Sequence, residues 1–556
     1  MINTDIKDWF AAGIPYIWLN AGAVAVSMLM VIGLVALIAV RGLGHFWPSR
    51  IAEFDFVESD NSRIRLIGEL ADKETVPRSR LPVTDKRAAH DMSIIDRYLI
   101  KIGNRDYFGL DFQWVLGAGM SNLDYPQDLM AVERREWGNF YGYLLSIKES
   151  DRVITGDVDR WSVLQRYIDE ATTVFEEIRY IEKDLIGAVN YQMERLRLRG
   201  KRLERDGITK GPEYDAMEHA GQKLQKEYSG YTDRLANLYE QLNRASFTAR
   251  MSDGREAEIP MAKVVRVYRP NAMSTVEKSV FYFEKLWEFM ADEPREANTE
   301  GGIFPAIFGT VLMVLIMAML VTPFGVIAAV YLREYARQGL LTRLIRIAVN
   351  NLAGVPSIVY GVFGLGFFVY FIGGNIDELF FSEALPSPTF GTPGLLWASL
   401  TLALLTVPVV IVATEEGLAR VPREIREGSL ALGATKAETL WRTVLPMTAS
   451  AMMTGLILAI ARASGEVAPL MLVGVVKLAP SLPMDGNFPY LHLDRKFMHL
   501  GFHIYDVGFQ SPNVEAARPL VYSTALLLVL IIILLNLAAI HIRNKLREKY
   551  RAAEQQ

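Results

Sequence analysis

A charged pair interrupts an apolar stretch of membrane-spanning length toward the C-terminus. Arg462 and Glu466 lie within residues 456–470, a segment whose other members are apolar or small. A charge at bilayer depth costs at least about 2.5–3.5 kcal/mol on insertion scales, so such a residue usually faces a cavity, a partner or a substrate. A spacing of four places both side chains on one helix face, one turn apart. We expect the two to pair at rest, with Arg462 able to present its donors to a passing anion.

The composition predicts an integral membrane protein with a large aqueous insert. Of the 556 residues 51% are hydrophobic, and these concentrate in long uninterrupted runs, whereas residues 41–300 are rich in charge. A net charge of −4 argues against a role in binding nucleic acid. The chain has no cysteine, which excludes disulfides, thiolate nucleophiles and cysteine metal sites.

Six runs approach the roughly 20 residues that a helix needs to cross a bilayer, which predicts an all-α membrane core. They are Ile17–Val40, Ile303–Leu332, Leu352–Gly374, Leu395–Thr414, Ala449–Gly474 and Pro519–Ile540. The first run is close to full spanning length and lacks a basic leading region and a small-residue cleavage site. We therefore interpret it as a retained anchor and not as a signal peptide.

The distribution of Lys and Arg between the runs predicts the orientation. The loops around residues 333–346 and 420–442 and the tail after residue 540 are basic, whereas the loop between the third and fourth runs has no Lys or Arg. Basic loops stay in the cytoplasm, and so do both termini. The first run argues for the opposite orientation, because only Lys7 precedes it whereas Arg41 and Arg50 follow it. We give this less weight, because long segments are translocated largely regardless of charge.

This orientation divides the chain into four regions. We expect an N-terminal cytoplasmic segment with the first span (1–40), an insert outside the cytoplasm (41–300), a transport core (301–540) and a basic cytoplasmic tail (541–556).

Two sequence patterns in the insert predict an α+β structure with a coiled-coil hairpin at about residues 158–247. Residues 63–67 and 263–268 alternate in polarity like strands. Apolar residues from Trp161 onward and from Tyr214 onward recur with three-four spacing, and Gly207 and Gly211-Pro212 mark a turn between the two helices. The aromatic residues of this pattern either form the seam of the hairpin or dock a soluble partner or sister subunit.

The loop at residues 415–448 has the chemistry of two short helices. Pro422 suits a first helical turn, Gly433 can adopt the left-handed conformation that ends a helix, and Thr435 with Glu438 forms a capping box. Pro446 closes the unit near the membrane. The loop also has an apolar face, which fits a groove of a partner or belongs to a surface hairpin without one: Leu430, Leu440, Trp441, Val444 and Leu445.

This loop resembles the EAA loop of ABC importer permeases, which docks onto a separate ATPase subunit. The resemblance rests on Glu427-Gly428-Ser429, then Gly433, then Leu445-Pro446. The loop departs from the general pattern at Gly428 and Ser429, where alanines are usual, and at Thr443. Small residues at 428 and 429 still permit a close approach of two helices.

The chain has no Walker A loop of its own. Gly-Lys occurs once, at Gly200-Lys201, and Arg202 follows instead of Ser or Thr. ATP must therefore be hydrolysed on another chain, and we expect no catalytic residue, metal or cofactor in this one.

Three further segments are similar to permeases of phosphate-uptake ABC transporters of the PstA type. They are residues 301–310, 351–361 and 462–470, and the resemblance covers about residues 301–540. It implies a type I importer permease fold in the bacterial inner membrane. It also implies as partners a PstC-type permease, two ATPase copies, a periplasmic phosphate-binding protein, phosphate and membrane lipid.

The resemblance implies that Arg462 and Glu466 act in phosphate translocation. A guanidinium offers phosphate a planar fork of donors, and we hypothesise that Glu466 pairs with Arg462 in one state and releases it in another. The alternative is a static pair that orients the subunits. Ser357, beside Pro356, either contacts the anion or belongs to a helix kink. The glycines of this span favour close helix packing: Gly361, Gly364 and Gly366.

Three readings of function remain open at this level. The leading one is a phosphate permease subunit, and a second changes the anion to sulfate, molybdate or tungstate, because Arg462 cannot choose among oxyanions. A third is a membrane-anchored sensor or scaffold, which needs neither the charged pair nor the loop at 415–448. A secondary transporter is disfavoured, since inverted repeats are not evident.

Overall fold

The computed structural model describes most of the chain. The described residues are 9, 12–57, 62–77, 94–150, 152–154, 159–511 and 514–554. Within them, no side chain is described at 297, 514–516, 546 and 549–554. The start of the predicted N-terminal segment, including Lys7, and the last two residues of the predicted basic tail lie outside the described residues.

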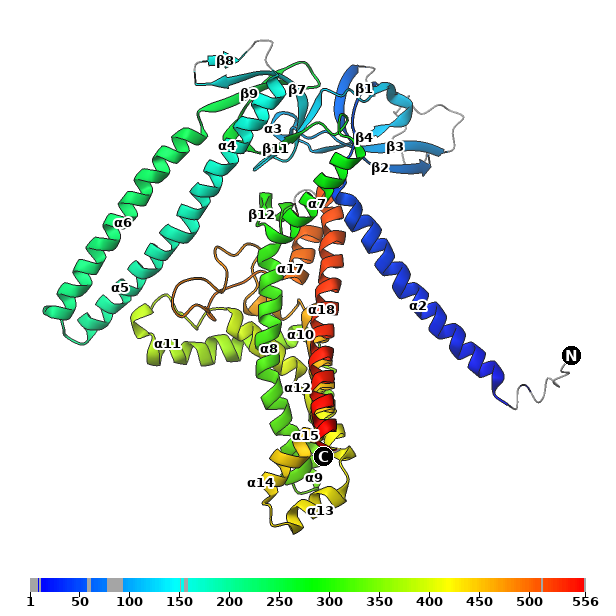
Figure 1. Cartoon of the computed structure of the whole chain (residues 1–556), viewed down its shortest axis with the longest axis vertical. Coiled ribbons are helices and arrows are strands. Elements are labelled where there is room, and N and C mark those ends of the chain that lie inside the picture. Colours follow the sequence, from blue (N-terminus) through cyan, green and yellow to red (C-terminus); the bar gives the residue numbers. More distant parts are fainter. Residues whose placement is uncertain are drawn as a thin grey trace.

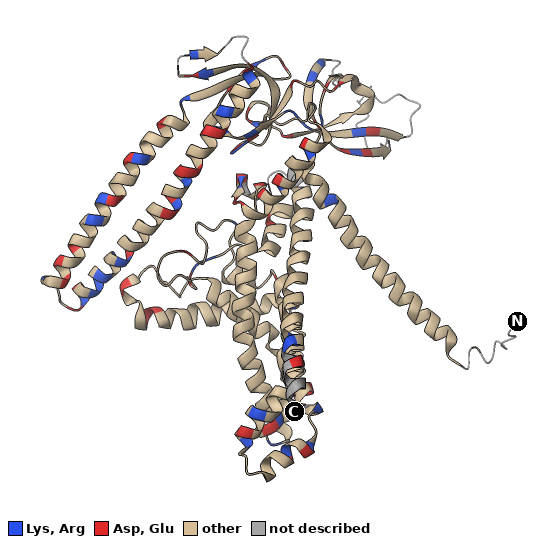
Figure 2. Ribbon diagram, in the orientation of Figure 1, with Lys and Arg blue, Asp and Glu red and all other residues tan. Residues whose placement is uncertain are grey.

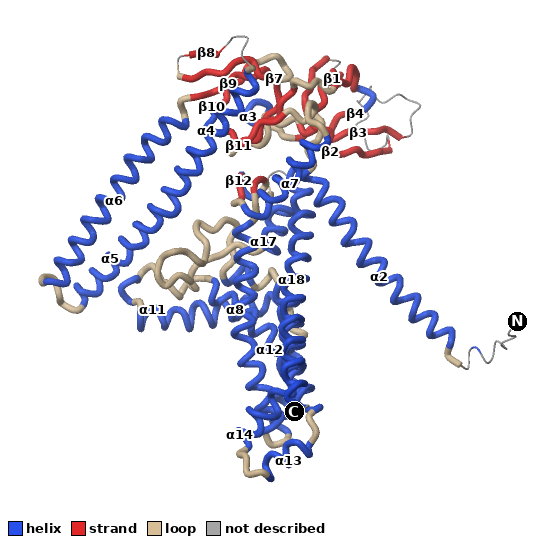
Figure 3. Tube along the Cα trace, viewed as in Figure 1, coloured by secondary structure: helices blue, strands red, loops and turns tan. Residues whose placement is uncertain are grey.

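The described chain has a strand-rich end and a helical end. Figure 3 shows the strands gathered at one end of the molecule, with a bundle of helices below them and a long helical hairpin at the side. Figure 1 shows the helices α13 and α14 at the far end of the bundle from the strands. The predicted insert and the predicted loop at 415–448 thus lie at opposite ends.

In the described part of the chain, six helices are long and apolar enough to cross a membrane, as predicted. They are Ile14–Phe46, Phe304–Tyr335, Ser357–Phe380, Leu395–Arg420, Lys436–Gly465 and Ala517–Lys545. Figure 2 shows that charged residues avoid the bundle and collect in the strand-rich end, the hairpin and the opposite tip. The protein is therefore a multi-pass membrane protein.

These spans contain the following α-helices. They are α2 (Ile14–Leu43), α8 (Phe304–Val330), α10 (Ser357–Phe363), α11 (Gly374–Phe380), α12 (Leu395–Arg420), α14 (Lys436–Thr439), α15 (Leu445–Gly465) and α18 (Val514–Glu554). Between them lie α9 (Leu340–Leu352), α13 (Arg423–Ala431), α16 (Leu470–Val473) and α17 (Leu500–Tyr505).

The helices α8, α12 and α15 pack closely because small residues face each other. A Cβ built on Gly455 of α15 would lie 2.7 Å from the Cβ of Ala413 on α12, so only glycine fits there. Met313 of α8, Leu402 of α12 and Ala463 of α15 belong to one buried cluster. Small residues at such contacts are what helix association in membranes requires.

Two predicted spans have wrong boundaries. The fifth was expected to continue to Gly474, but its helix ends at Gly465. Pro469 has no backbone N–H and disfavours helical geometry in the residue before it, so the apolar segment breaks before it can form one long helix. The third begins at Ser357 and not at Leu352, because residues 340–352 form the separate amphipathic helix α9.

The described part of the insert contains two large antiparallel sheets. The first has the order β4-β3-β2-β1-β5 and the second β10-β9-β7-β6-β11, with β8 beside β7. The strands of the first are β1 (Ile51–Val57), β2 (Arg63–Pro77), β3 (Ile94–Lys101), β4 (Phe112–Leu116) and β5 (Met120–Asp124). Those of the second are β6 (Leu129–Arg134), β7 (Phe140–Glu149), β8 (Arg152–Ile154), β9 (Ala245–Arg250), β10 (Glu256–Pro260) and β11 (Val264–Tyr268).

The two sheets share a buried core. Ile51 and Ile67 of the first sheet pack with Leu129 and Tyr141 of the second. The segments predicted as strands at 63–67 and 263–268 fall in β2 and β11. The remaining strands are more numerous than the sequence pattern indicated, which makes the insert richer in β-structure than expected.

A helical hairpin joins β8 to β9. Its first arm comprises α4 (Arg160–Tyr180), a π-helical stretch (Ile181–Ile186) and α5 (Gly187–Arg205), and its second arm is α6 (Pro212–Leu242). The π-helical stretch contains Glu182, a charged residue within the apolar pattern of this arm. Gly207 and Gly211 have φ angles of 78° and 131°, which places the turn where it was predicted.

The second arm ends before the predicted limit at about residue 247. The helix α6 ends at Leu242, and Ala245 begins β9. The insert is completed by α3 (Arg105–Phe108), α7 (Thr275–Ala291) and the short pair β12 (Pro294–Arg295) and β13 (Glu300–Gly301), which lead into α8.

Candidate functional site

Arg462 and Glu466 form an ion pair at the end of α15. The Nε atom of Arg462 lies 3.7 Å from Oε1 of Glu466, and the two side chains are 31% and 22% exposed. Glu466 is the first residue beyond the helix and has extended backbone angles. The pair therefore spans the helix end, whereas the sequence placed both residues on one helix face.

The pair is loose. Its 3.7 Å separation exceeds hydrogen-bond length. In the described part of the chain, the structure gives the Arg462 guanidinium no hydrogen bond to another residue. The two side chains share no hydrogen bond, so separating them breaks no hydrogen bond. The guanidinium thus keeps donors that an oxyanion can use.

The helix core fixes the position of Arg462. Its neighbour Ala463 is fully buried, and Ser464 donates its hydroxyl proton to the carbonyl oxygen of Ile460 at 2.7 Å. Ala463 also packs in the cluster that contains Met313 of α8 and Leu402 of α12. Arg462 therefore extends from a rigid, closely packed turn.

The third span packs against the break after Glu466. A Cβ on Gly361 of α10 would lie 2.7 Å from Cα of Pro469, and one on Gly364 would lie 2.3 Å from Oγ1 of Thr401. The predicted close packing is confirmed at these two glycines. Gly366 has no atom within 4 Å of such a Cβ, so that part of the prediction is wrong.

Ser357 is the first residue of α10, directly after Pro356. Among the described residues, no hydrogen bond joins Ser357 to Arg462 or Glu466. Tyr360, one turn further along α10, donates its hydroxyl proton to the carbonyl oxygen of Leu352 at 2.7 Å. This hydrogen bond ties the start of the third span to the end of α9. A contact between Ser357 and an anion stays a prediction.

The loop at 415–448 forms the two predicted helices, α13 and α14. Gly433 has a φ of 90° and follows the end of α13, as expected for a residue that stops a helix. The capping box is present: the backbone N–H of Thr435 donates to Glu438 at 2.8 Å, and the N–H of Glu438 donates to the Thr435 hydroxyl at 3.2 Å. Pro422 precedes the first helical residue.

Pro446 does not close this unit. Lys436–Gly465 is one continuous helix that passes through a π-helical stretch at Leu440–Val444, and Pro446 lies in the first turn of α15. Pro446 lies inside this continuous helix, directly after the π-helical stretch, where its missing N–H leaves a carbonyl of the preceding turn without that donor. The helix that starts in the loop at 415–448 is therefore the fifth span itself.

The apolar face of the loop is divided. Leu440 and Val444 are buried against Leu418 and Val421, so they hold the loop to the bundle. The exposed members are apolar side chains with no cover in the described chain: Leu430 (46%), Leu432 (90%) and Trp441 (75%). Sequence reasoning missed Leu432, which follows the small residues of the motif.

The motif residues of α13 have an open outer side. A Cβ on Gly428 would meet nothing within 4 Å. Ser429 and Thr439 share a hydrogen bond of 2.9 Å between their hydroxyl oxygens, which ties α13 to α14. Glu427 is exposed. Space for a second molecule thus exists beside Gly428.

Arg426 fixes α13 to the bundle, a role that the sequence did not indicate. Its guanidinium donates to Oε1 of Glu334 at 3.0 Å and to the carbonyl oxygens of Leu418 and Val421 at 2.7 Å each. Lys436 also donates to the carbonyl oxygen of Glu334. The end of the second span is therefore clamped to both helices of the loop.

A separate cavity of about 460 Å³ lies where the insert meets the bundle. Its lining carries both signs of charge, including Lys101 and Lys285 beside Glu69, Glu288 and Glu300. Such a mixture gives no preference for an anion. The cavity does not include Arg462 or Glu466, so it is not part of the charged pair.

Comparison with known proteins identifies the family. Residues 321–548 match the family model described as the binding-protein-dependent transport system inner membrane component. The phosphate transport system permease protein PstA 1 of Mycobacterium tuberculosis is 35% identical over 247 residues, which cover 44% of this chain and 71% of that relative. The chain belongs to the PstA-type permease family. The PstA protein of Yersinia pestis is 33% identical over 268 residues, which cover 48% of this chain and 80% of the relative.

Members of this family are transport components of the membrane and not enzymes. Among solved structures, a chain of the inward-facing MetNI methionine ABC transporter is 17% identical with a TM-score of 0.32, over 43% of this chain and 94% of that one. The matched family model begins after the insert, at residue 321.

Proposed function

We propose that this PstA-type permease is one half of the pore of an ABC importer that moves inorganic phosphate across the bacterial inner membrane. The carrying observation is the loose Arg462–Glu466 pair, 3.7 Å apart, at the end of a closely packed helix of a protein in this family. ATP hydrolysis on a separate subunit drives the movement.

The charged pair acts as an exchangeable site. Phosphate accepts hydrogen bonds from the planar guanidinium of Arg462, which Glu466 otherwise holds by charge attraction without a hydrogen bond. A permanently tight site would trap the anion, so competition by Glu466 allows release. Ser357 opens the helix whose Gly361 packs on Pro469, three residues after Glu466, and we assign it a contact on the path of the anion.

The loop at 415–448 couples this site to the ATPase. Its exposed residues Leu430, Leu432 and Trp441 form a face that fits a groove on another subunit. The motif residues that support this docking are Glu427, Gly428, Ser429, Gly433, Leu445 and Pro446. Two ATPase copies bind in the assembled importer, one below each permease.

We assign two further partners to the importer, a second permease and a phosphate-binding protein. A PstC-type permease supplies the second half of the pore and covers the exposed phenylalanines of the third span, among them Phe363 and Phe371. The loop at 415–448 and both termini lie in the cytoplasm, the insert lies in the periplasm, and a phosphate-binding protein docks on the periplasmic side. Residues 301–540 have the type I importer permease fold, and the hairpin packs as a coiled coil.

Uptake by the assembled importer in proteoliposomes tests the proposal. We expect ATP-dependent accumulation of labelled phosphate that excess sulfate, molybdate or tungstate does not suppress. Suppression by one of these anions, with accumulation of that anion, would assign the pore to a different substrate. Accumulation of no oxyanion at all would favour the sensor or scaffold.

A further inference from the structure

The helical hairpin reaches the loops at the insert end of the bundle. Its helix α5 contacts the loop 474–499, which lies between α16 and α17. The Tyr191 hydroxyl donates to the carbonyl oxygen of Phe488 at 2.7 Å, and the Tyr191 ring lies 5.4 Å from the ring of His492. The guanidinium of Arg195 lies 5.7 Å from the centre of the Phe488 ring.

The same helix contacts the loop between the third and fourth spans. Arg202 pairs with Glu383, and Arg205 donates to the Ser382 hydroxyl. The side chain of Glu383 is only 6% exposed, and its next cationic neighbour, Arg205, is 4.0 Å away. A carboxylate this buried needs its partner, since an unpaired charge in such a place is strongly unfavourable. The hairpin therefore bridges two loops that are about 100 residues apart in sequence.

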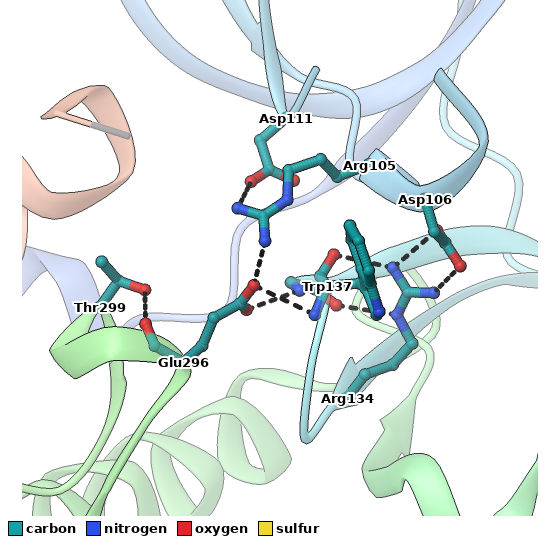
Figure 4. Close-up of polar contacts among 8 residues, drawn as sticks. Arg105, Asp106, Asp111, Arg134, Trp137, Glu296 and Thr299 are labelled. Atoms are coloured by element: carbon teal, nitrogen blue, oxygen red, sulfur yellow. Dashed lines mark hydrogen bonds and ion pairs between the residues drawn. The ribbon is translucent and has the colours of Figure 1, made fainter. Parts of the chain in front are cut away.

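A second bridge joins the insert to loop 474–499. Glu296, between β12 and β13, accepts hydrogen bonds from Arg105 and from the backbone N–H groups of Trp137 (3.1 Å) and Gly138 (2.7 Å), as Figure 4 shows. Two residues later, Asn298 donates to the carbonyl oxygen of Lys477 at 3.0 Å.

This junction is held in a strained conformation. Glu296 and Asn298 have backbone φ angles of 41° and 72°, positive values that residues other than glycine rarely adopt. Asn298 also donates to Oδ2 of Asp506 at 3.1 Å, and Lys477 pairs with Asp506 at 3.2 Å. Such strain persists only where the surrounding contacts over-determine the backbone.

Loop 474–499 is itself rigid and begins eight residues after Glu466. Asp485 pairs with Arg495 at 2.6 Å and with His492 at 2.9 Å. At its start, the backbone N–H of Gly474 donates to the carbonyl oxygen of Leu470 at 3.2 Å. Displacement of this loop is therefore transmitted through one short helix, α16, to the chain beside the charged pair.

We propose that the insert acts as a brace that positions loop 474–499 and, through it, Glu466 beside Arg462. Tyr191, Arg202 and Asn298 are the positioning residues of this brace. The inference rests on the proposed function, because it assigns to the insert the regulation of the same anion site. In the transport cycle the brace and both loops move together, and movement of the hairpin changes how Glu466 competes for Arg462.

Two substitutions weaken the brace, and each has a matched control in the hairpin. Tyr191→Phe removes only a hydroxyl, and Arg202→Ala removes the partner of Glu383. The controls are Tyr180→Phe and Arg199→Ala, since both residues are exposed and the described structure gives them no hydrogen bond or ion pair. Arg202→Lys keeps the charge and should restore most of the behaviour of the unmodified protein.

The first readout is hydrogen exchange in the assembled importer. The backbone N–H of Asp485 donates to Tyr490 at 3.1 Å and that of His492 to Pro483 at 2.8 Å. Loss of the Tyr191 hydrogen bond should speed exchange of these amides about three- to tenfold in Tyr191→Phe, but not in Tyr180→Phe. Arg202 contacts Glu383, so Arg202→Ala should speed exchange of the neighbouring Ala384 amide, which donates to Phe381 at 2.9 Å, whereas Arg199→Ala should not. This readout does not depend on which anion is carried.

The second readout is phosphate uptake by the same complexes. We expect the maximal rate to fall about threefold in Tyr191→Phe and Arg202→Ala with an unchanged half-saturating phosphate concentration. Exchange equal to that of the controls would overturn the brace while leaving the proposed function intact. Faster exchange with unchanged uptake would also overturn it, because the contacts would then be structural only. If the unmodified importer carries no phosphate, the proposed function fails, whereas the exchange result still reports on the contact.

Discussion

Arg426 offers a direct test of how the loop at 415–448 is held to the bundle. Replacing it with alanine removes three hydrogen bonds, to Glu334, Leu418 and Val421, at 2.7–3.0 Å. It also leaves the Glu334 carboxylate without this partner. The Arg426 and Glu334 side chains are 19% and 13% exposed, so water can screen only part of the loss.

The size of the effect follows from this burial. Breaking a fully buried pair by removing one partner costs about 3–5 kcal/mol, and partial exposure of both side chains reduces this to about 2 kcal/mol. Since each 1.4 kcal/mol is a factor of ten, local opening of α13 should become about thirtyfold more frequent. Glu334→Gln keeps an acceptor and loses only the charge, so about 1 kcal/mol and a fivefold change are expected.

Hydrogen exchange of the α13 amides in the assembled importer measures this opening. Arg423→Ala is the matched control, because Arg423 begins the same helix, is exposed and has no ion pair in the described structure. We expect faster exchange in Arg426→Ala together with less phosphate carried for each ATP hydrolysed. Equal exchange in Arg426→Ala and Arg423→Ala would refute the view that Arg426 holds α13 to the bundle.

Three further outcomes are expected. Leu432→Asp should abolish crosslinking of photoreactive groups at Glu427 or Leu430 to the ATPase, because Leu432 is 90% exposed at the proposed contact, and crosslinks that persist unchanged would contradict the coupling role. Gly433→Ala should destabilise the end of α13 by about 1–2 kcal/mol, because its φ of 90° is unfavourable for a side chain, and exchange at Leu432 and Ala434 measures this. Burial raises the pKa of Glu300 from 4.5 to about 7, so its contribution to the stability of the insert is full below pH 4.5 and is lost as the pH rises through 7. Glu300→Gln should therefore raise the unfolding temperature at pH 8 and flatten its dependence on pH, and an unchanged pH profile would contradict this.

Local sequence signals predicted much of the helical structure. The capping box at Thr435 and the turn at Gly207 depend on residues within a few positions of each other, so the chain reveals them directly. Six apolar runs predicted six helices for the same reason, since spanning length is a property of one segment. The break at Gly465 was missed because the apolar pattern outweighed the glycine and Pro469, although both were visible.

Contacts between distant segments were beyond the sequence. Arg426 and Glu334 are 92 positions apart, and Arg202 and Glu383 are 181 apart, with no local pattern that pairs them. The order of strands in the two sheets depends on such distant pairing as well, so only two of the strands were predicted from alternation. The brace and the contacts of Arg426 with the bundle are consequently visible only once the chain is folded.

The role of Arg462 is tested most directly by uptake of labelled phosphate in proteoliposomes containing the complete importer with Arg462→Ala or Arg462→Lys. Loss of the planar fork should reduce uptake strongly in the alanine variant and partly in the lysine variant, which keeps the charge as a single point. Both complexes should still assemble and bind the ATPase. Uptake in Arg462→Ala equal to that of the unmodified importer would contradict the view that this side chain meets the anion in transit.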